Sequence, residues 1–216
     1  MSELVAIFIT AFLVGLSGAL MPGPLLIVNL HQTGQRGWSA APLVTLGHGL
    51  AELLFLAALL IGFGRWLAQP QAAQLIATLG GSVLLYMSLG MLREAKMASL
   101  SPTHTSKASP GWGPITAGLV TSFSNPYWFV WWSTVGATYV ALVRPLGWAG
   151  LLAFFSGHIF SDLSWFLVVS LTFVSGRRLF SDRVYRYVLT ALAGFLALLG
   201  GGFLLYALHL GSGGNI

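Results

Sequence analysis

The sequence predicts an all-α, polytopic membrane protein with six transmembrane helices. Of its 216 residues, 56% are hydrophobic and only 7% are charged, whereas a soluble domain has about a quarter charged residues. A helix needs roughly 20 apolar residues to cross a hydrocarbon core of about 30 Å. Six runs are long enough: Leu4–Leu30, Ser39–Phe63, Ala72–Leu92, Trp112–Tyr139, Gly147–Val174 and Tyr185–Leu208.

The first run is predicted to be a membrane span and not a cleaved signal peptide. It follows Glu3 instead of a basic segment, and it is much longer than the roughly 7–15 apolar residues of a signal peptide. We therefore expect it to remain in the mature chain.

Basic residues indicate how the six runs are oriented. Short cytoplasmic loops are enriched in lysine and arginine. The loops after the second and fourth runs contain only Arg65 and Arg144. Most basic residues follow the first, third and fifth runs: Arg36, Arg93, Lys96, Lys107, Arg177, Arg178, Arg183 and Arg186. This bias predicts a multi-pass protein of the inner or plasma membrane with both termini outside, and it explains the net charge of +5 without nucleic-acid binding.

The two halves of the chain contain similar segments in the same order. Gly47-His48-Gly49-Leu50-Ala51-Glu52 recurs 110 residues later as Gly157-His158-Ile159-Phe160-Ser161-Asp162, and Leu79-Gly80-Gly81 recurs 120 residues later as Leu199-Gly200-Gly201. We expect one membrane domain, residues 1–216, made of repeat 1 (1–92), a polar linker (93–113) and repeat 2 (114–216). Because each repeat has three helices, the second enters the membrane in the opposite orientation. Such inverted repeats are typical of secondary transporters.

Proline interrupts the first helix of each repeat. Pro22, Gly23 and Pro24 lie within the first run, and Asn125-Pro126 lies within the fourth. Proline removes a backbone donor and clashes with the preceding turn, so helices 1 and 4 are predicted to be broken. A helix that restarts at Pro24 directs free N–H groups and a positive dipole end at a bound carboxylate. We predict a substrate site at these breaks: Pro22, Gly23, Pro24, Asn125, Pro126 and the aromatic Trp128.

Two pairs of ionisable residues lie within predicted spans. His48 and Glu52, like His158 and Asp162, are four residues apart and therefore share a helix face. Acids are costly at this depth and usually face the interior of the protein. Each pair can exchange protons or bind the substrate, can hold helices together, or can contribute to a four-ligand site for a divalent metal such as Zn²⁺ or Ni²⁺. We favour a proton or substrate site, with no metal or other cofactor.

Gly15 through Pro22-Gly23-Pro24-Leu25, Gly118 through Ser124-Asn125-Pro126, and the six-helix pattern resemble the LysE-type translocator family. This resemblance implies an inner-membrane carrier that exports small amino compounds using the proton gradient or membrane potential. Tyr127 stands where many members have lysine, which indicates a divergent branch. The wider superfamily also includes thiol-disulfide and metal carriers; the complete absence of cysteine excludes the thiol chemistry.

The sequence therefore predicts a secondary transporter that exports an amino acid or a similar zwitterion. The alternatives are a divalent-metal transporter using His48, Glu52, His158 and Asp162, and a membrane scaffold without transport. An enzyme is not expected, because no catalytic triad, metal-hydrolase motif or phosphate loop is present. The expected partners are a small-molecule substrate and lipid, and helix-face glycines make a homodimer reasonable.

Overall fold

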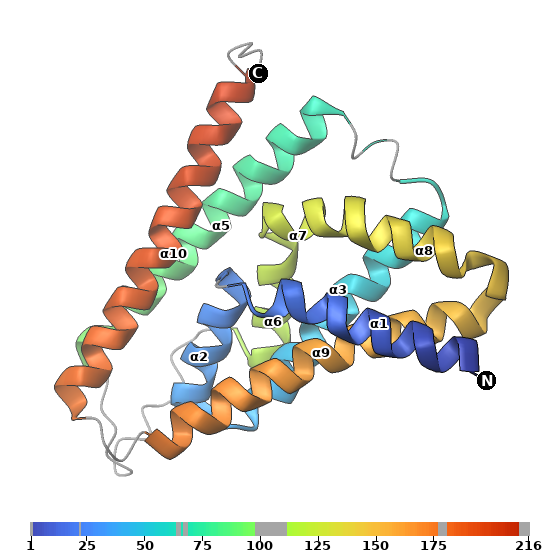
Figure 1. Cartoon of the computed structure of the whole chain (residues 1–216). Coiled ribbons are helices and arrows are strands. Elements are labelled where there is room, and N and C mark those ends of the chain that lie inside the picture. Colours follow the sequence, from blue (N-terminus) through green and yellow to red (C-terminus); the bar gives the residue numbers. More distant parts are fainter. Residues whose placement is uncertain are drawn as a thin grey trace.

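The computed structural model describes residues 2–21, 23–63, 66, 69–97, 112–176 and 181–211, with no β-strand among them. Five helical stretches are long and apolar enough to cross a membrane: Ser2–Ala19, Ala40–Leu60, Pro70–Arg93, Pro126–Gly176 and Asp182–Gly211. Figure 1 shows these helices crossing one another at varied angles. An all-helical, multi-pass membrane architecture is therefore confirmed.

In the first half, the predicted first span is two helices. α1 (Ser2–Ala19) ends before the proline segment, and α2 (Pro24–Arg36) begins at its second proline. Gly23 between them is extended, with φ −136° and ψ −179°. The next helices, α3 (Ala40–Leu60) and α5 (Pro70–Met97), match the second and third predicted spans. The helical end of α5 means that the linker predicted for 93–113 begins too early, while 98–111 lie outside the described residues.

In the second half, the predicted fourth span Trp112–Tyr139 is also interrupted. α6 (Pro114–Phe123) ends directly before Ser124 and Asn125, and α7 (Pro126–Trp131) starts after them. A π-helical segment (Trp132–Gly136), α8 (Ala137–Val143) and a 3-10 turn (Arg144–Leu146) lead into α9 (Gly147–Gly176). α10 (Asp182–Gly211) completes the bundle. The predicted break of the fourth span at Asn125-Pro126 is therefore present, and with only 10 residues α6 is too short to cross a bilayer alone.

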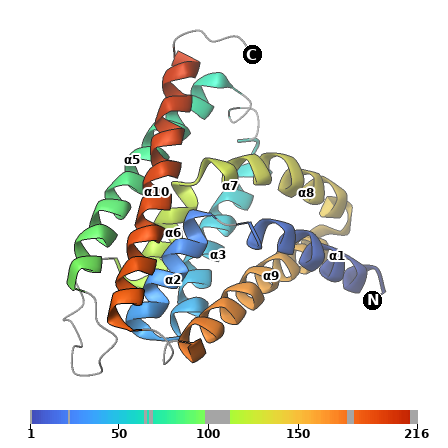
Figure 2. The same cartoon turned by 60° about the vertical axis from the view of Figure 1, so that its left-hand side comes forward.

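Helices of the two halves are interleaved. α1 packs along α9, α6 packs along α3, and α5 packs along α10. Figures 1 and 2 both show α5 and α10 side by side as a pair that leans away from α1 and α9. The pairing is reciprocal, because the first helix of each half lies on the histidine-bearing helix of the other half.

Glycines allow these close contacts. A Cβ at Gly118 of α6 would overlap the carbonyl oxygen of Val44 in α3. At the crossing of α5 and α10, a Cβ on Gly81 would lie 2.7 Å from the Gly200 oxygen, and one on Gly200 would lie 2.8 Å from the Gly81 oxygen. The repeated glycine segment therefore marks the contact between equivalent helices, as small residues do in membrane proteins.

Gly118→Ala is expected to destabilise the protein, because α6 and α3 must separate to accommodate the new methyl group. Overpacking of this kind costs about 1–3 kcal/mol. Gly90→Ala in α5 is the matched control, since a Cβ there meets no atom within 4 Å. Thermal unfolding in detergent should give a lower Tm for Gly118→Ala and an unchanged or higher Tm for Gly90→Ala. Equal Tm values for the two variants would contradict the close contact.

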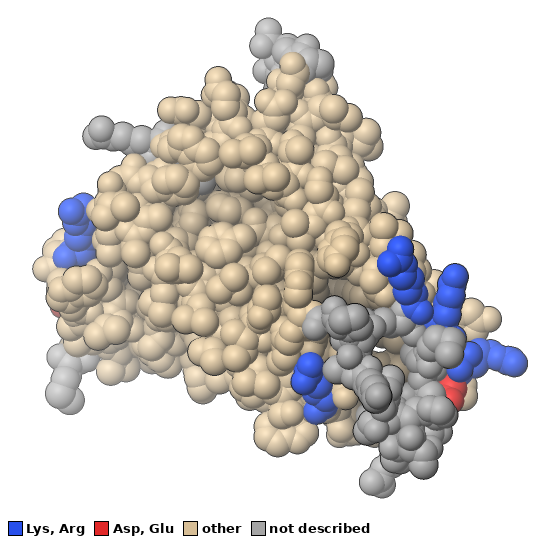
Figure 3. All heavy atoms as spheres, turned by 180° about the vertical axis from the view of Figure 1, so that it is seen from behind, with Lys and Arg blue, Asp and Glu red and all other residues tan. Residues whose placement is uncertain are grey.

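The surface has a broad apolar region and one basic end. Many leucines are more than half exposed, among them Leu13, Leu54, Leu79 and Leu198, as expected of lipid-facing positions. Arg144 lies in the 3-10 turn between α8 and α9. The other described lysine and arginine residues lie near the ends of α2 and α5 and the start of α10, which meet at one end of the bundle: Arg36, Arg93, Lys96, Arg183 and Arg186. Figure 3 shows most blue side chains gathered at one end of the face in view, which is otherwise largely uncharged. This region is called the basic end below; its cytoplasmic location remains a prediction.

Candidate functional site

The two helix breaks open into one cavity of about 300 Å³. Gly23, Pro24 and Asn125 line it at the breaks, and Trp128 lines it from α7. All four were predicted as site residues. Pro126 starts α7 but is not among the lining residues, and Pro22 lies outside the described residues.

All four predicted ionisable residues meet at this cavity. His48 and Glu52 come from α3, and His158 and Asp162 come from α9. Their exposed fractions are only 1–5%. We call these four residues the His/acid cluster. Its assembly depends on α3 and α9 packing against each other at the centre of the interleaved bundle.

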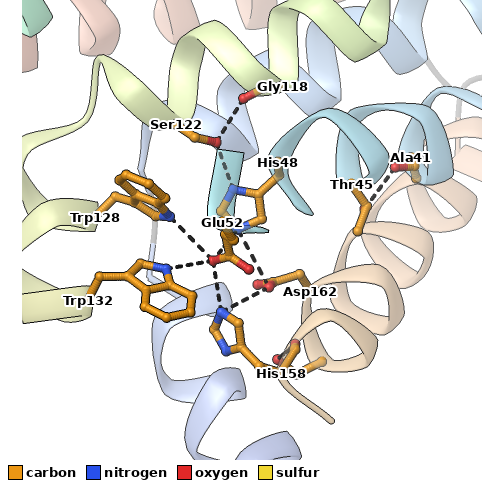
Figure 4. Close-up of polar contacts among 11 residues, drawn as sticks. Ala41, Thr45, His48, Glu52, Gly118, Ser122, Trp128, Trp132, His158 and Asp162 are labelled. Atoms are coloured by element: carbon orange, nitrogen blue, oxygen red, sulfur yellow. Dashed lines mark hydrogen bonds and ion pairs between the residues drawn. The ribbon is translucent and has the colours of Figure 1, made fainter. Parts of the chain in front are cut away.

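Glu52 makes the most hydrogen bonds and short ion pairs of the four residues in the His/acid cluster. Its Oε1 lies 2.9 Å from His158 Nε2 and 3.1 Å from His48 Nε2. The indole N–H of Trp132 donates to the same oxygen at 2.9 Å, and that of Trp128 donates at 3.3 Å. Figure 4 shows both indoles pointing at this carboxylate. Four N–H groups around one oxygen form an environment that favours an anion.

Asp162 makes longer polar contacts than Glu52. Its Oδ2 is 3.6 Å from His48 Nε2 and from His158 Nε2, which is beyond a good hydrogen bond. This buried oxygen has no hydrogen-bond partner among the described residues. The two acids therefore differ, although they occupy equivalent positions in the sequence repeat.

Ser122 connects the His/acid cluster to α6. Its Oγ is 2.7 Å from His48 Nδ1 and donates to the Gly118 carbonyl at 2.8 Å. A hydroxyl has one proton to donate, so in this arrangement His48 Nδ1 donates to Ser122. With Nε2 directed at Glu52, the His48 ring links Ser122 of α6 to Glu52 of α3.

Several site residues were not predicted from sequence. Ser122 and Trp132 contact the His/acid cluster, and Trp131 stacks on His158 with ring centroids 4.6 Å apart. Trp128 and Trp132 are one helical turn apart, so the run of aromatic residues after Asn125-Pro126 was the available signal. That run did not reveal which indoles face inward, because consecutive helical residues point in all directions.

The start of α2 also faces the cavity. Pro24, Leu25 and Leu26 line it, and no side chain caps this helix end. The first N–H groups of a helix have no intrahelical partner. In α7, by contrast, the Asn125 Oδ1 accepts a hydrogen bond from the Tyr127 N–H at 3.1 Å. Of the two half-helices, α2 therefore offers the more open anion-binding end.

Comparison with known proteins identifies the family. The model of the LysE type translocator family matches residues 16–208. The chain is also similar to the chemotactic transduction protein ChpE of Pseudomonas aeruginosa, with 26% identity over 163 residues, or 75% of this chain and 79% of ChpE. No solved structure matches the chain significantly. The family match covers both helix breaks and the whole His/acid cluster, and on this basis the chain belongs to the LysE type translocator family of membrane transporters.

Proposed function

We propose that the protein is a secondary transporter that exports an amino acid or a similar small zwitterion. The observation that carries this proposal is the shared cavity, in which the uncapped start of α2 and the acids of the His/acid cluster face the same space. An uncapped helix N-terminus suits a carboxylate, and a buried acid suits an ammonium group. A cavity of about 300 Å³ is at the small end of ligand sites, which favours a small substrate.

The two acids have different roles in this proposal. Glu52 is the fixed counter-ion of both histidines, because its Oε1 is already surrounded by N–H groups. Asp162 binds the substrate ammonium group or exchanges a proton, because its buried Oδ2 lies 3.6 Å from both histidines and has no hydrogen-bond partner among the described residues. Coupling to a proton gradient or to the membrane potential would act through the same cluster, since intramembrane ionisable residues commonly mark transport pathways.

The proposed transport cycle uses the two halves as inverted repeats of three helices each. Support comes from the two breaks at equivalent positions and the reciprocal packing of α1 on α9 and α6 on α3. Rocking of one repeat against the other around a central site would expose the cavity to each side in turn. We place both termini outside and the protein in the inner or plasma membrane. A homodimer is also proposed, because Gly194, Gly201 and Gly202 on α10 meet no atom within 4 Å.

Divalent-metal transport is the second candidate, supported by one observation. One nitrogen or oxygen from each cluster residue lies within 4.8 Å of all the others, and the four histidine–carboxylate distances are 2.9–3.6 Å. Ligands about 2.0–2.1 Å from a tetrahedral Zn²⁺ have similar separations. However, Glu52 Oε1 already accepts from two indoles, so we rank a metal substrate below a zwitterion.

A thermal-shift screen followed by flux measurements tests the proposal. A ligand that binds the folded state at 100 times its Kd stabilises it by about 2.7 kcal/mol. We expect at least one amino acid or amine to raise the Tm of the detergent-purified protein, and the same compound to move across proteoliposomes under an imposed gradient. Stabilisation by Zn²⁺, Ni²⁺ or Co²⁺ alone would favour the metal candidate. No ligand-dependent flux under any gradient would indicate a scaffold.

A further inference from the structure

A second group of polar residues lies beyond the cavity, between α2 and α9. Asn29 and Thr33 come from α2, and Ser170 comes from α9; all three side chains are completely buried. The Asn29 Nδ2 donates to Ser170 Oγ at 2.9 Å, and Thr33 Oγ1 is 2.8 Å from the same oxygen. We call these three residues the inner polar site.

The inner polar site lies about two helical turns from the His/acid cluster along α9. Asp162, Phe166 and Ser170 are successive residues at four-residue spacing, so they follow one helix face. Phe166 lines the cavity together with Asp162, and its carbonyl is 3.5 Å from the Asn29 Nδ2. The buried Phe166 therefore lies between the cavity and the inner polar site along α9.

Polar contacts continue from α2 toward the basic end. Gln32 is almost completely buried and donates from Nε2 to the Trp112 carbonyl at 3.1 Å. Its Oε1 accepts from Arg36 Nε at 3.2 Å, and Arg36 is exposed at the end of α2. Polar side chains thus extend from Phe166 to the basic end.

The equivalent region of the second half is apolar. Counted from the proline that starts each half-helix, Asn29 corresponds to Trp131, and Thr33 corresponds to Val135. Counted from the histidines, Phe166 corresponds to Leu56, and Ser170 corresponds to Leu60. These counterparts all belong to one apolar cluster or pack against it. A polar contact needed only to hold helices together would serve both halves, yet it is present only in the half that leads to the basic end.

One atom of the inner polar site is available to a ligand. Asn29 Oδ1 is buried and has no hydrogen-bond partner among the described residues. Leaving an acceptor unpaired in a buried site costs about 1–3 kcal/mol. An unpaired amide oxygen suits the N–H groups of an ammonium, while the hydroxyls of Thr33 and Ser170 contact each other and the Asn29 Nδ2.

Resting on the proposed export of a zwitterion, we propose that Asn29, Thr33 and Ser170 form a second substrate site. This site receives the ammonium group of the substrate between the basic end and the central cavity, and Phe166 is the gate between the two sites. All three side chains are completely buried, so the substrate reaches the inner polar site in a second conformation of the carrier, whereas the equivalent Val135, Leu56 and Leu60 have no polar side-chain group to offer it.

The absence of cysteine allows a direct accessibility test. Single cysteines at Thr33 and Ser170 are compared with controls at the equivalent positions Val135 and Leu60, using a membrane-impermeant, quaternary-ammonium methanethiosulfonate applied to the basic end in vesicles. The control positions are less buried than Thr33 and Ser170, so faster labelling of Thr33→Cys and Ser170→Cys would not follow from exposure. We expect Thr33→Cys and Ser170→Cys to react at least 10-fold faster than the controls. Equal rates at all four positions would overturn the proposed route.

A second measurement separates the gate and the site from simple packing. Leu199 lines the cavity, so Leu199→Cys should react slowly from the basic end in the parent chain and at least 10-fold faster with Phe166→Ala. Asn29→Leu should reduce flux at least 10-fold at a preserved Tm. Wild-type flux in Asn29→Leu, or no effect of Phe166→Ala, would overturn these assignments. Because the reagent needs no substrate, fast labelling with no amino-compound binding would contradict the proposed function but leave the route intact.

Discussion

Glu52→Gln is expected to reduce transport at least 100-fold in proteoliposomes, or about 2.7 kcal/mol. The glutamine amide is similar in size but has no charge, so both histidines lose their counter-ion and two indole N–H groups lose an anionic acceptor. Removing one partner of a buried ion pair typically costs about 3–5 kcal/mol. The Tm should therefore also fall.

Two variants make this result specific. Glu3→Gln removes an acid from an exposed position in the first turn of α1 and should leave flux and Tm unchanged. Glu52→Asp keeps the charge on a shorter side chain and should retain part of the flux. Normal flux in Glu52→Gln would show that the Glu52 charge is not needed for transport. Equal losses in Glu52→Asp and Glu52→Gln would show that transport needs the length of the Glu52 side chain as much as its charge.

Asp162→Asn is expected to abolish coupled transport while leaving the Tm unchanged or higher. The Asp162 Oδ2 is buried 3.6 Å from both histidines and has no hydrogen-bond partner among the described residues. Replacing a poorly paired buried charge by a neutral group is often neutral or stabilising. The substrate, by contrast, loses the carboxylate that we assign to its ammonium group, so its apparent affinity should fall at least 10-fold.

The Asp162→Asn result is best interpreted beside Glu52→Gln. Flux and Tm should fall together in Glu52→Gln, whereas only flux and ligand-induced stabilisation should fall in Asp162→Asn. A lower Tm in both variants, with unchanged ligand affinity in Asp162→Asn, would show that both acids act as structural ion pairs. Retention of gradient-driven flux in Asp162→Asn would remove this residue from coupling.

The aromatic run shows where prediction from sequence was incomplete. Trp128 was predicted to line the site, and it does line the cavity. Its contact with Glu52, and the shorter contact made by Trp132, depend on which side of α7 and of the start of the π-helical segment faces α3. The local sequence shows that aromatic residues follow the break. The rotation of α7 relative to α3, however, is set by packing between helices that are distant in the chain.

The sequence repeat predicted where the two His/acid pairs lie, but it did not predict that their two acids have different surroundings. Equivalent spacing in His48-x-x-x-Glu52 and His158-x-x-x-Asp162 predicted two matched pairs. In the structure, one oxygen of Glu52 contacts both histidines at 2.9 and 3.1 Å, while Asp162 Oδ2 lies 3.6 Å from each. Because indole donors come only from the second half, the surroundings of the two acids are unequal.

Composition, apolar length and proline position by themselves determined an all-helical membrane protein with helix breaks at two points. These features follow from local physics, because lipid requires every backbone group to be paired within a helix and proline prevents that pairing. Only the tertiary structure decided that α1 lies on α9 and α6 on α3, and that the breaks, indoles and His/acid cluster share one cavity. Those contacts join residues far apart in the chain, and they depend on how closely glycine lets two backbones approach, which no single segment specifies.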